Sequence, residues 1–228
     1  MVFEISTARK EILQKLSEQA WTPTELADEL GKSRNTVYNH LEDLYDQEVL
    51  TKKKVKAKTR PKTEYSIEDG LIQYITVLPD QYAQKNVKLT PEKQTVLRIW
   101  SLPQKEFQPY VERYWWKLKN KLDYRKDIKS VAIYGSVARG EADEDGDIDI
   151  LVITEDKKTK KLVSEEFGSI RLESEEGSKI CMTEAYSIEE YRKSLENNSD
   201  FLNSIKDELH IVYDPGRIFQ NSEKVHDQ

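Results

Sequence analysis

The sequence is poor in the residues that build covalent or metal cross-links. Its 228 residues include one cysteine, Cys181, and three histidines, His40, His210 and His226. A single cysteine excludes an internal disulfide, and the histidines lack the spacing of zinc ligands. No apolar run is long enough to cross a bilayer, and no hydrophobic stretch near the N-terminus has the pattern of a signal peptide. We therefore expect a cytoplasmic protein with no membrane partner.

Charge is distributed unevenly along the chain. Residues 1–80 contain 12 basic and 14 acidic side chains, residues 81–130 contain 12 and 5, and residues 131–228 contain 12 and 23. The formal net charge of −6 therefore conceals a basic middle segment and an acidic C-terminal half. This asymmetry argues against one uniform nucleic-acid-binding surface, although local basic patches can still bind. The length allows one large domain or two modest ones.

The most informative stretch lies between residues 131 and 152. The residues Val131-Ala-Ile-Tyr-Gly-Ser-Val-Ala-Arg-Gly140 predict a buried strand and a tight turn that opens a short helix. After an acidic segment, Asp147-Ile148-Asp149 begins a second buried strand. Alternate strand residues face the same side, so Asp147 and Asp149 project together, with Cα atoms about 6.6 Å apart. Such a pair suits divalent cations, and a neighbouring Gly135-Ser136 turn would offer N–H groups to phosphate. Together they suit a metal-bound nucleoside triphosphate.

These residues resemble the signature of a known enzyme superfamily. Gly135-Ser136, Ala138-Arg139-Gly140 and Asp147-Ile148-Asp149 are similar to the motif of the DNA polymerase beta-like nucleotidyltransferases, particularly their minimal prokaryotic members. The resemblance covers roughly residues 129–228 and implies an α/β (α+β) domain with a small mixed sheet. It also implies that Asp147 and Asp149 hold two Mg²⁺ (or Mn²⁺) ions. Gly135 and Ser136 would then hold the terminal phosphates, and Arg139 would offset phosphate charge or pair with Glu141.

The third carboxylate of this superfamily is harder to place. It commonly comes from a third strand, which we expect at residues 178–183, and the matching position is Met182. Glu184 lies two residues further on the same strand face and is the predicted replacement, with a catalytic role. If Glu184 does not reach the metals, the third ligand is missing, and the general base and catalysis itself are in question.

Two simpler interpretations of the acidic segment stay open. The run from Glu141 to Ile148 imitates the start of an EF-hand loop, but its twelfth position is Val152 rather than the bidentate glutamate. Predicted strands rather than helices also flank it, so calcium binding is disfavoured. The other alternative is an acidic surface turn without chemistry, which would not require a Gly-Ser pair and a further glycine before it.

The N-terminal segment has the order of a helix-turn-helix domain. Helical apolar spacing from Ala8 to Leu16 follows Ser6 or Thr7 as a cap, Pro23 opens a short second helix, and Ser33 caps a third. A basic run between two strand-like segments then predicts a wing. This domain, placed at residues 1–79, is similar to bacterial and archaeal winged-helix transcription regulators.

The winged-helix resemblance implies contact with double-stranded DNA. The third helix would enter the major groove, and the lysine-rich wing would touch phosphates. A soluble hairpin whose lysines protect exposed strand edges is the alternative interpretation of the wing. The predicted DNA contacts are Arg34, Asn35, Thr36, Tyr38, Asn39, Lys52, Lys53, Lys54, Lys56, Lys58 and Arg60.

Residues 80–128 are expected to form a helical connector. We predict an apolar helix or the edge of the winged domain at residues 70–78, a hinge at 79–91 and a helix at 90–100. From Gln104 onward, apolar residues follow the spacing of a long amphipathic helix that packs on the C-terminal domain. They are Phe107, Tyr110, Val111, Tyr114, Trp115, Leu118 and Leu122. Single-stranded nucleic-acid binding by these aromatics is the disfavoured alternative, and Trp116 lies off the stripe, free for an interface.

The C-terminal domain is placed at residues 129–228. Beyond the motif strands we expect a charged loop at residues 155–161 and a helix at 162–167. The sequence therefore predicts a metal-dependent nucleotidyltransferase that transfers an NMP from an NTP to an unknown protein or RNA acceptor, tethered to a DNA-binding winged helix. One alternative is a transcription regulator whose nucleotidyltransferase domain senses NTP or metal without turnover. Another is a toxin–antitoxin component, and a homodimer is a further hypothesis.

Overall fold

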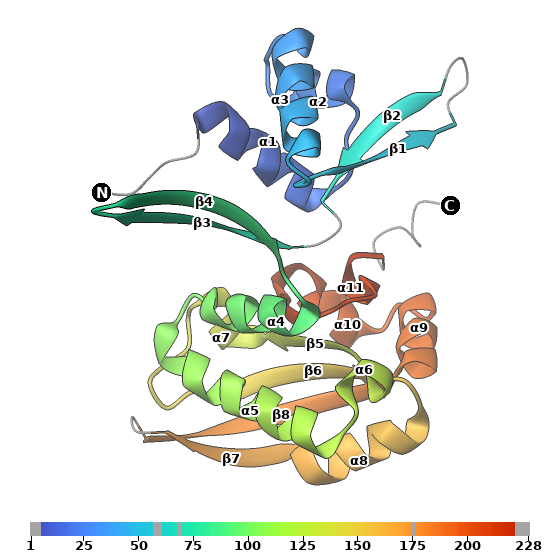
Figure 1. Cartoon of the computed structure of the whole chain (residues 1–228). Coiled ribbons are helices and arrows are strands. Elements are labelled where there is room, and N and C mark those ends of the chain that lie inside the picture. The colour runs from blue at the N-terminus through green and yellow to red at the C-terminus, as the bar shows by residue number, and fades with distance from the viewer. Residues whose placement is uncertain (1–5, 57–60, 68–69, 175–176, 222–228) are drawn as a thin grey trace. The chain divides into compact units, whose positions relative to one another are not determined.

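The computed structural model describes residues 6–56, 61–67, 70–174 and 177–221 (Figure 1). The chain forms two compact units, which divide between Thr90 and Pro91. Two predicted wing contacts, Lys58 and Arg60, lie outside the described residues. No helix within the described ranges is both long enough and apolar enough to cross a membrane.

Three helices open the first unit: α1 Thr7–Glu18, α2 Pro23–Glu29 and α3 Arg34–Asp46. Side chains cap two of them, because Thr22 forms a capping box with Glu25 and the Ser33 hydroxyl accepts from the Thr36 N–H. Ser6 occupies the N-cap of α1 without a side-chain hydrogen bond. The apolar faces of the helices meet in one core, and the predicted helix-turn-helix order is confirmed.

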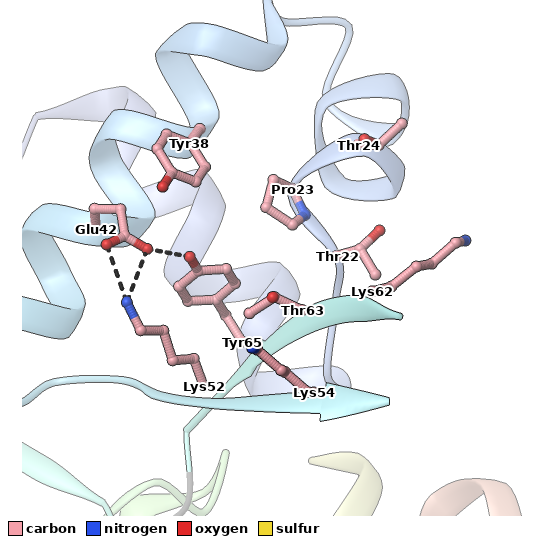
Figure 2. A pocket seen from close by; sticks show the side chains of 10 residues that line it. All are labelled: Thr22, Pro23, Thr24, Tyr38, Glu42, Lys52, Lys54, Lys62, Thr63 and Tyr65. Carbon is pink, nitrogen blue, oxygen red and sulfur yellow. Dashed lines mark hydrogen bonds and ion pairs between the residues drawn. The ribbon is translucent and has the colours of Figure 1, made fainter. Parts of the chain in front are cut away.

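The wing is an antiparallel hairpin of β1, Thr51–Val55, and β2, Lys62–Ser66, as predicted. Tyr65 anchors it, because this residue is 1% exposed and forms a backbone bridge with Trp21. The Tyr65 hydroxyl also donates to Glu42 of α3 (Figure 2). The wing is therefore fixed to the helical core at its base.

A second antiparallel hairpin follows, formed by β3, Leu71–Leu78, and β4, Gln81–Lys88. Residues 70–78 therefore do not form the predicted helix, but they belong to the first unit, in line with the other predicted possibility, an edge of the winged domain. Most of the predicted hinge at residues 79–91 is the turn and β4, and the boundary between the two units falls at its end. The turn Pro79-Asp80 pairs Leu78 with Gln81 and so sets the register of both strands. The first unit thus continues through β4, beyond the limit predicted at residue 79.

The second unit is built on a five-stranded mixed sheet in the order β7-β8-β6-β5-β9. Its strands are β5 Ile128–Tyr134, β6 Ile148–Thr154, β7 Ser169–Ser174, β8 Gly177–Ser187 and β9 His210–Tyr213. β6 runs antiparallel to β5 and parallel to β8, which places the two motif strands and the predicted third strand side by side. The expected mixed sheet is confirmed, whereas β7 has no counterpart in the prediction.

Helices cover both faces of this sheet (Figure 1). One layer contains α4 Pro91–Trp100, η1 Lys105–Phe107, α5 Gln108–Lys121, α6 Tyr124–Asp127 and α8 Lys157–Phe167. The other contains α9 Ile188–Glu196, α10 Asp200–Ile205 and α11 Ile218–Asn221. The predicted apolar stripe along η1 and α5 is buried, with Leu122 partly so, and Trp116 is 46% exposed. Residues 91–128 are therefore part of the core of the second unit.

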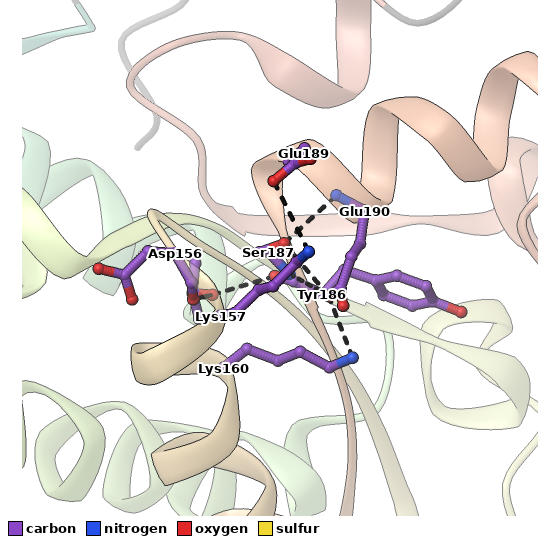
Figure 3. A network of polar contacts seen from close by, with 8 residues as sticks. Asp156, Lys157, Lys160, Tyr186, Ser187, Glu189 and Glu190 are labelled. Atoms are coloured by element: carbon purple, nitrogen blue, oxygen red, sulfur yellow. Dashed lines mark hydrogen bonds and ion pairs between the residues drawn. The ribbon is translucent and has the colours of Figure 1, made fainter.

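Polar contacts join the starts of α8 and α9 (Figure 3). Asp156 accepts from the Thr159 N–H at 2.8 Å and caps α8, which begins five residues before the predicted helix at 162–167. The expected charged loop at residues 155–161 is therefore mostly helical, which corrects that prediction. Lys160 of α8 pairs with Glu190 of α9 at 3.0 Å and ties the two helix starts together.

The single cysteine is part of the sheet core. Cys181 pairs with Ile148 across β8 and β6 and is buried. Burial, followed by the charge of Asp147, raises the pKa of its thiol to about 12. The thiol is therefore protonated and shielded in the folded protein.

Candidate active site and nucleic-acid interface

The two motif carboxylates lie where β6 begins. Asp147 directly precedes the strand, and Asp149 is its second residue, opposite Tyr134 of β5. Ile148 belongs to the core on one face of the sheet, and Leu151 belongs to the core on the other. Because strand residues alternate, Asp149 shares the face of Leu151, away from the α5 layer.

Gly135 is held against Asp149 at the start of α7, Gly135–Arg139. Its φ is +71°, in the left-handed region that favours glycine. A Cβ at this position would lie 2.7 Å from Asp149 Oδ2, closer than side-chain atoms tolerate. The turn therefore needs glycine for its backbone conformation and for the approach of the carboxylate. The predicted phosphate-binding turn and one predicted metal ligand are thus in direct contact.

Asp149 lies in a negative environment. Burial, and then the charges of Asp147 and Glu208, raise the pKa of its carboxyl above the ordinary value. Burial, and then the charges of Asp149 and Glu184, raise the pKa of Tyr134 to about 12. A divalent cation would relieve the repulsion between Asp147 and Asp149, and carboxylate oxygens are the ligands that Mg²⁺ and Mn²⁺ prefer. Asp147 and Asp149 therefore suit such an ion as two of its ligands.

A glutamate that the sequence did not single out reaches the same turn. The Gly135 N–H donates to Glu208 Oε1 at 3.1 Å, and Arg139 Nη1 donates to Glu208 Oε2. Arg139 also donates through Nε to Glu141 Oε2 at 2.8 Å, one of the two roles predicted for it. Glu208 ends the short helix η2, Lys206–Glu208, and the pairing of β9 with β5 brings it to the turn. No local sequence signal indicates a contact across 73 residues.

The third strand places a methionine beside the carboxylate pair. In the parallel pairing of β6 and β8, Asp149 stands opposite Met182, and Leu151 stands opposite Glu184. The Cα of Glu184 thus lies roughly 8 Å from that of Asp149 by strand geometry. Within the described part of the chain, no three carboxylate, histidine or cysteine side chains are grouped so as to hold a metal ion. The catalytic role of Glu184 stays a prediction.

The predicted DNA contacts that the structure describes are accessible. Val37 and Leu41 are fully buried, so α3 presents one face to the core and the other to solvent. The candidates that are exposed on α3 and the wing are Arg34, Asn35, Thr36, Tyr38, Asn39, Lys52, Lys53, Lys54 and Lys56. This exposure is what contact with a polyanion requires, and the contacts themselves stay predictions.

A cavity of about 530 Å³ lies between α3, the wing and the start of α2 (Figure 2). Its lining residues are Thr22, Pro23, Thr24, Tyr38, Glu42, Lys52, Lys54, Lys62, Thr63 and Tyr65. Glu42 accepts from Lys52 Nζ at 3.1 Å, and Lys62 pairs with Glu25 at 3.0 Å. Carboxylates therefore already neutralise two lysines of the wing, which the basic run in the sequence did not indicate.

Residues 116–217 match the family described as nucleotidyltransferase domain, and residues 6–52 match the family described as helix-turn-helix domain. The first range includes the motif strands, the third strand and Glu208, and the second includes α1, α2 and α3. No curated protein gives a significant match to the chain. The chain therefore combines a helix-turn-helix domain with a nucleotidyltransferase domain.

Proposed function

We propose that this protein is a metal-dependent nucleotidyltransferase that moves an NMP from an NTP to an acceptor hydroxyl, and that its helix-turn-helix domain holds it on double-stranded DNA. The packing of Asp149 Oδ2 against Gly135 carries the proposal. It joins a carboxylate able to bind a divalent cation to a backbone turn able to bind phosphate. Nucleotidyl transfer requires both functions next to each other.

The charge of the site supports a requirement for Mg²⁺ or Mn²⁺. The charges of Asp147 and Glu208 both act on Asp149, and Arg139 pairs with Glu208. A triphosphate is itself strongly anionic, so this site would repel it in the absence of cations. Asp147 and Asp149 would hold the metal ions, which when bound neutralise the triphosphate and activate the acceptor hydroxyl.

Residues of the chain would supply the remaining contacts. The Gly135 N–H and Ser136 would bind the terminal phosphates, and Arg139 would offset the charge of the leaving pyrophosphate. The acceptor oxygen attacks the α-phosphorus, the bond from that phosphorus to the bridging oxygen breaks, and pyrophosphate leaves. The acceptor proton passes to a base, for which Glu184 on β8 is our candidate.

One specific observation favours a second function, nucleotide sensing without turnover. Met182 stands opposite Asp149, where the superfamily resemblance leads us to expect a third carboxylate. Two carboxylates could bind a metal nucleotide and report it to the DNA-binding domain without transferring it. A toxin–antitoxin component with a protein or tRNA acceptor is a narrower form of the first function. A cytoplasmic location suits all three, and a homodimer is compatible with each.

The test incubates the full chain with α-labelled NTPs, Mg²⁺ or Mn²⁺, and candidate protein and RNA acceptors. Wild type should transfer label, and Asp149→Asn should transfer about 100-fold less or lower, because a lost metal ligand removes several kcal/mol of transition-state stabilisation. Glu173→Gln, at an exposed carboxylate on β7, is the matched control. Equal transfer by wild type and Asp149→Asn would contradict the proposal. NTP binding that alters DNA affinity without any transfer would assign the sensor function instead.

A further inference from the structure

The carboxylate of Glu208 occupies the two donors that the phosphates of a nucleotide would use. One oxygen accepts the Gly135 N–H at 3.1 Å, and the other accepts Nη1 of Arg139. The Glu208 side chain is 20% exposed, so water reaches this contact only in part. Phosphate groups are bound by the same combination of backbone N–H and guanidinium donors. The site therefore already contains an anion that belongs to the protein.

Glu208 comes from a segment that can release it while the sheet stays intact. It is the last residue of η2, a helix with no buried residue. The strand that follows is held by its pairing with β5, and its Val212 and Tyr213 lie in the core. Rotation of the Glu208 side chain therefore breaks the two hydrogen bonds to the turn without moving a core residue.

The contact also has an electrostatic cost. Glu208 places a further carboxylate on the Gly135 turn, against which Asp149 also packs. A metal-bound nucleotide would give Gly135 and Arg139 phosphate oxygens whose charge the metal compensates. Exchange of Glu208 for such a ligand would therefore relieve the repulsion.

We propose that Glu208 is an autoinhibitory latch, whose carboxylate mimics a phosphate on Gly135 and Arg139, so that a nucleoside triphosphate binds only as Glu208 leaves. The inference rests on the proposed function, because it concerns the same phosphate site. The latch raises the apparent dissociation constant for nucleotide above that of the open site, in inverse proportion to the fraction of molecules that are open. A ligand or partner that turns Glu208 away would activate the enzyme.

The test measures Mg²⁺-dependent binding of a non-hydrolysable NTP analogue to the full chain by isothermal titration calorimetry. Glu208→Ala frees both donors, and we expect its dissociation constant to be about tenfold lower than that of wild type, or lower still. Glu208→Gln keeps the shape and removes the charge, so it should show a smaller gain in affinity and a better-preserved fold. Glu141→Gln is the matched control, because Glu141 holds Arg139 without touching Gly135. It should change the affinity less than either Glu208 variant.

Melting temperatures of the same variants distinguish an autoinhibitory role of Glu208 from a purely structural one. If Glu208 only stabilises η2, its variants have lower melting temperatures and bind the analogue no better than wild type. That result would overturn the latch without contradicting the proposed function. If wild type and both Glu208 variants are folded and none binds the analogue, the proposed function fails and the latch fails with it. Tighter binding by the Glu208 variants supports both.

Discussion

Replacement of Gly135 by alanine tests the contact on which the candidate active site depends. The left-handed backbone, with φ +71°, costs an alanine roughly 1–2 kcal/mol. The added Cβ would lie 2.7 Å from Asp149 Oδ2, whereas ordinary van der Waals contact begins at 3.4 Å, so the carboxylate has to retreat. A displacement of about 1 Å near a reacting centre costs about 100-fold in rate.

We therefore expect Gly135→Ala to lose about 100-fold in nucleotidyl transfer while its melting temperature falls by only about 2–8 °C. Label transfer and scanning calorimetry on the same preparation measure the two effects. Gly140→Ala is the matched control, since Gly140 has φ +76° and its added Cβ would meet Pro103 Cβ at 3.0 Å instead of a carboxylate. Gly140→Ala should lose a similar amount of stability and retain most of the nucleotidyl-transfer activity. Wild-type transfer by Gly135→Ala would refute our account of the site.

Two further predictions concern charged side chains outside the active site. Glu42→Gln should strengthen DNA binding, because it releases Lys52 from an ion pair at 3.1 Å. The slope of the logarithm of the DNA-binding constant against the logarithm of salt concentration should steepen by up to about 0.9. Fluorescence-anisotropy titrations measure this slope, and an unchanged slope would argue against the wing contact. Asp156→Asn should make the free energy of unfolding depend less on pH under acidic conditions. Hydrogen bonds from the Thr159 backbone and side chain lower the pKa of Asp156 in the folded protein. The ionised carboxylate therefore stabilises the fold fully above the ordinary pKa of 3.8, and this stabilisation is lost as the pH falls through the lowered pKa of the folded state. Urea unfolding across this pH range measures the difference, and identical curves for variant and wild type would contradict the prediction.

Local spacing was sufficient to predict the helices of the first unit and the motif of the second. The cap at Ser33 and the buried positions Val37 and Leu41 define α3 within a few residues, because capping and helical periodicity are local. Gly135 and Asp149 likewise belong to consecutive elements, β5, α7 and β6, so chain order alone brings them near each other. Their direct contact then follows from the antiparallel pairing of the strands.

Contacts between distant segments could not be predicted in this way. Glu208 reaches Gly135 only because β9 pairs with β5, and nothing near Glu208 in the sequence indicates that pairing. Residues 71–78 are mostly apolar, so periodicity does not separate a strand from a helix, and pairing with β4 decides the outcome. The neutralisation of Lys52 by Glu42 is tertiary as well, since the partners come from the wing and the third helix.

Cys181 gives the second unit a natural reporter of its own fluctuations. It is the only cysteine in the chain, and it is buried in β8 beside the strand that carries Asp149. A thiol reagent can reach it only when the sheet opens locally or globally, and a pKa of about 12 keeps the thiolate scarce until then. The rate of thiol labelling would therefore report on the opening of the nucleotidyltransferase domain alone, because the helix-turn-helix domain contains no cysteine. A nucleotide that binds the closed sheet would slow this labelling in proportion to its affinity.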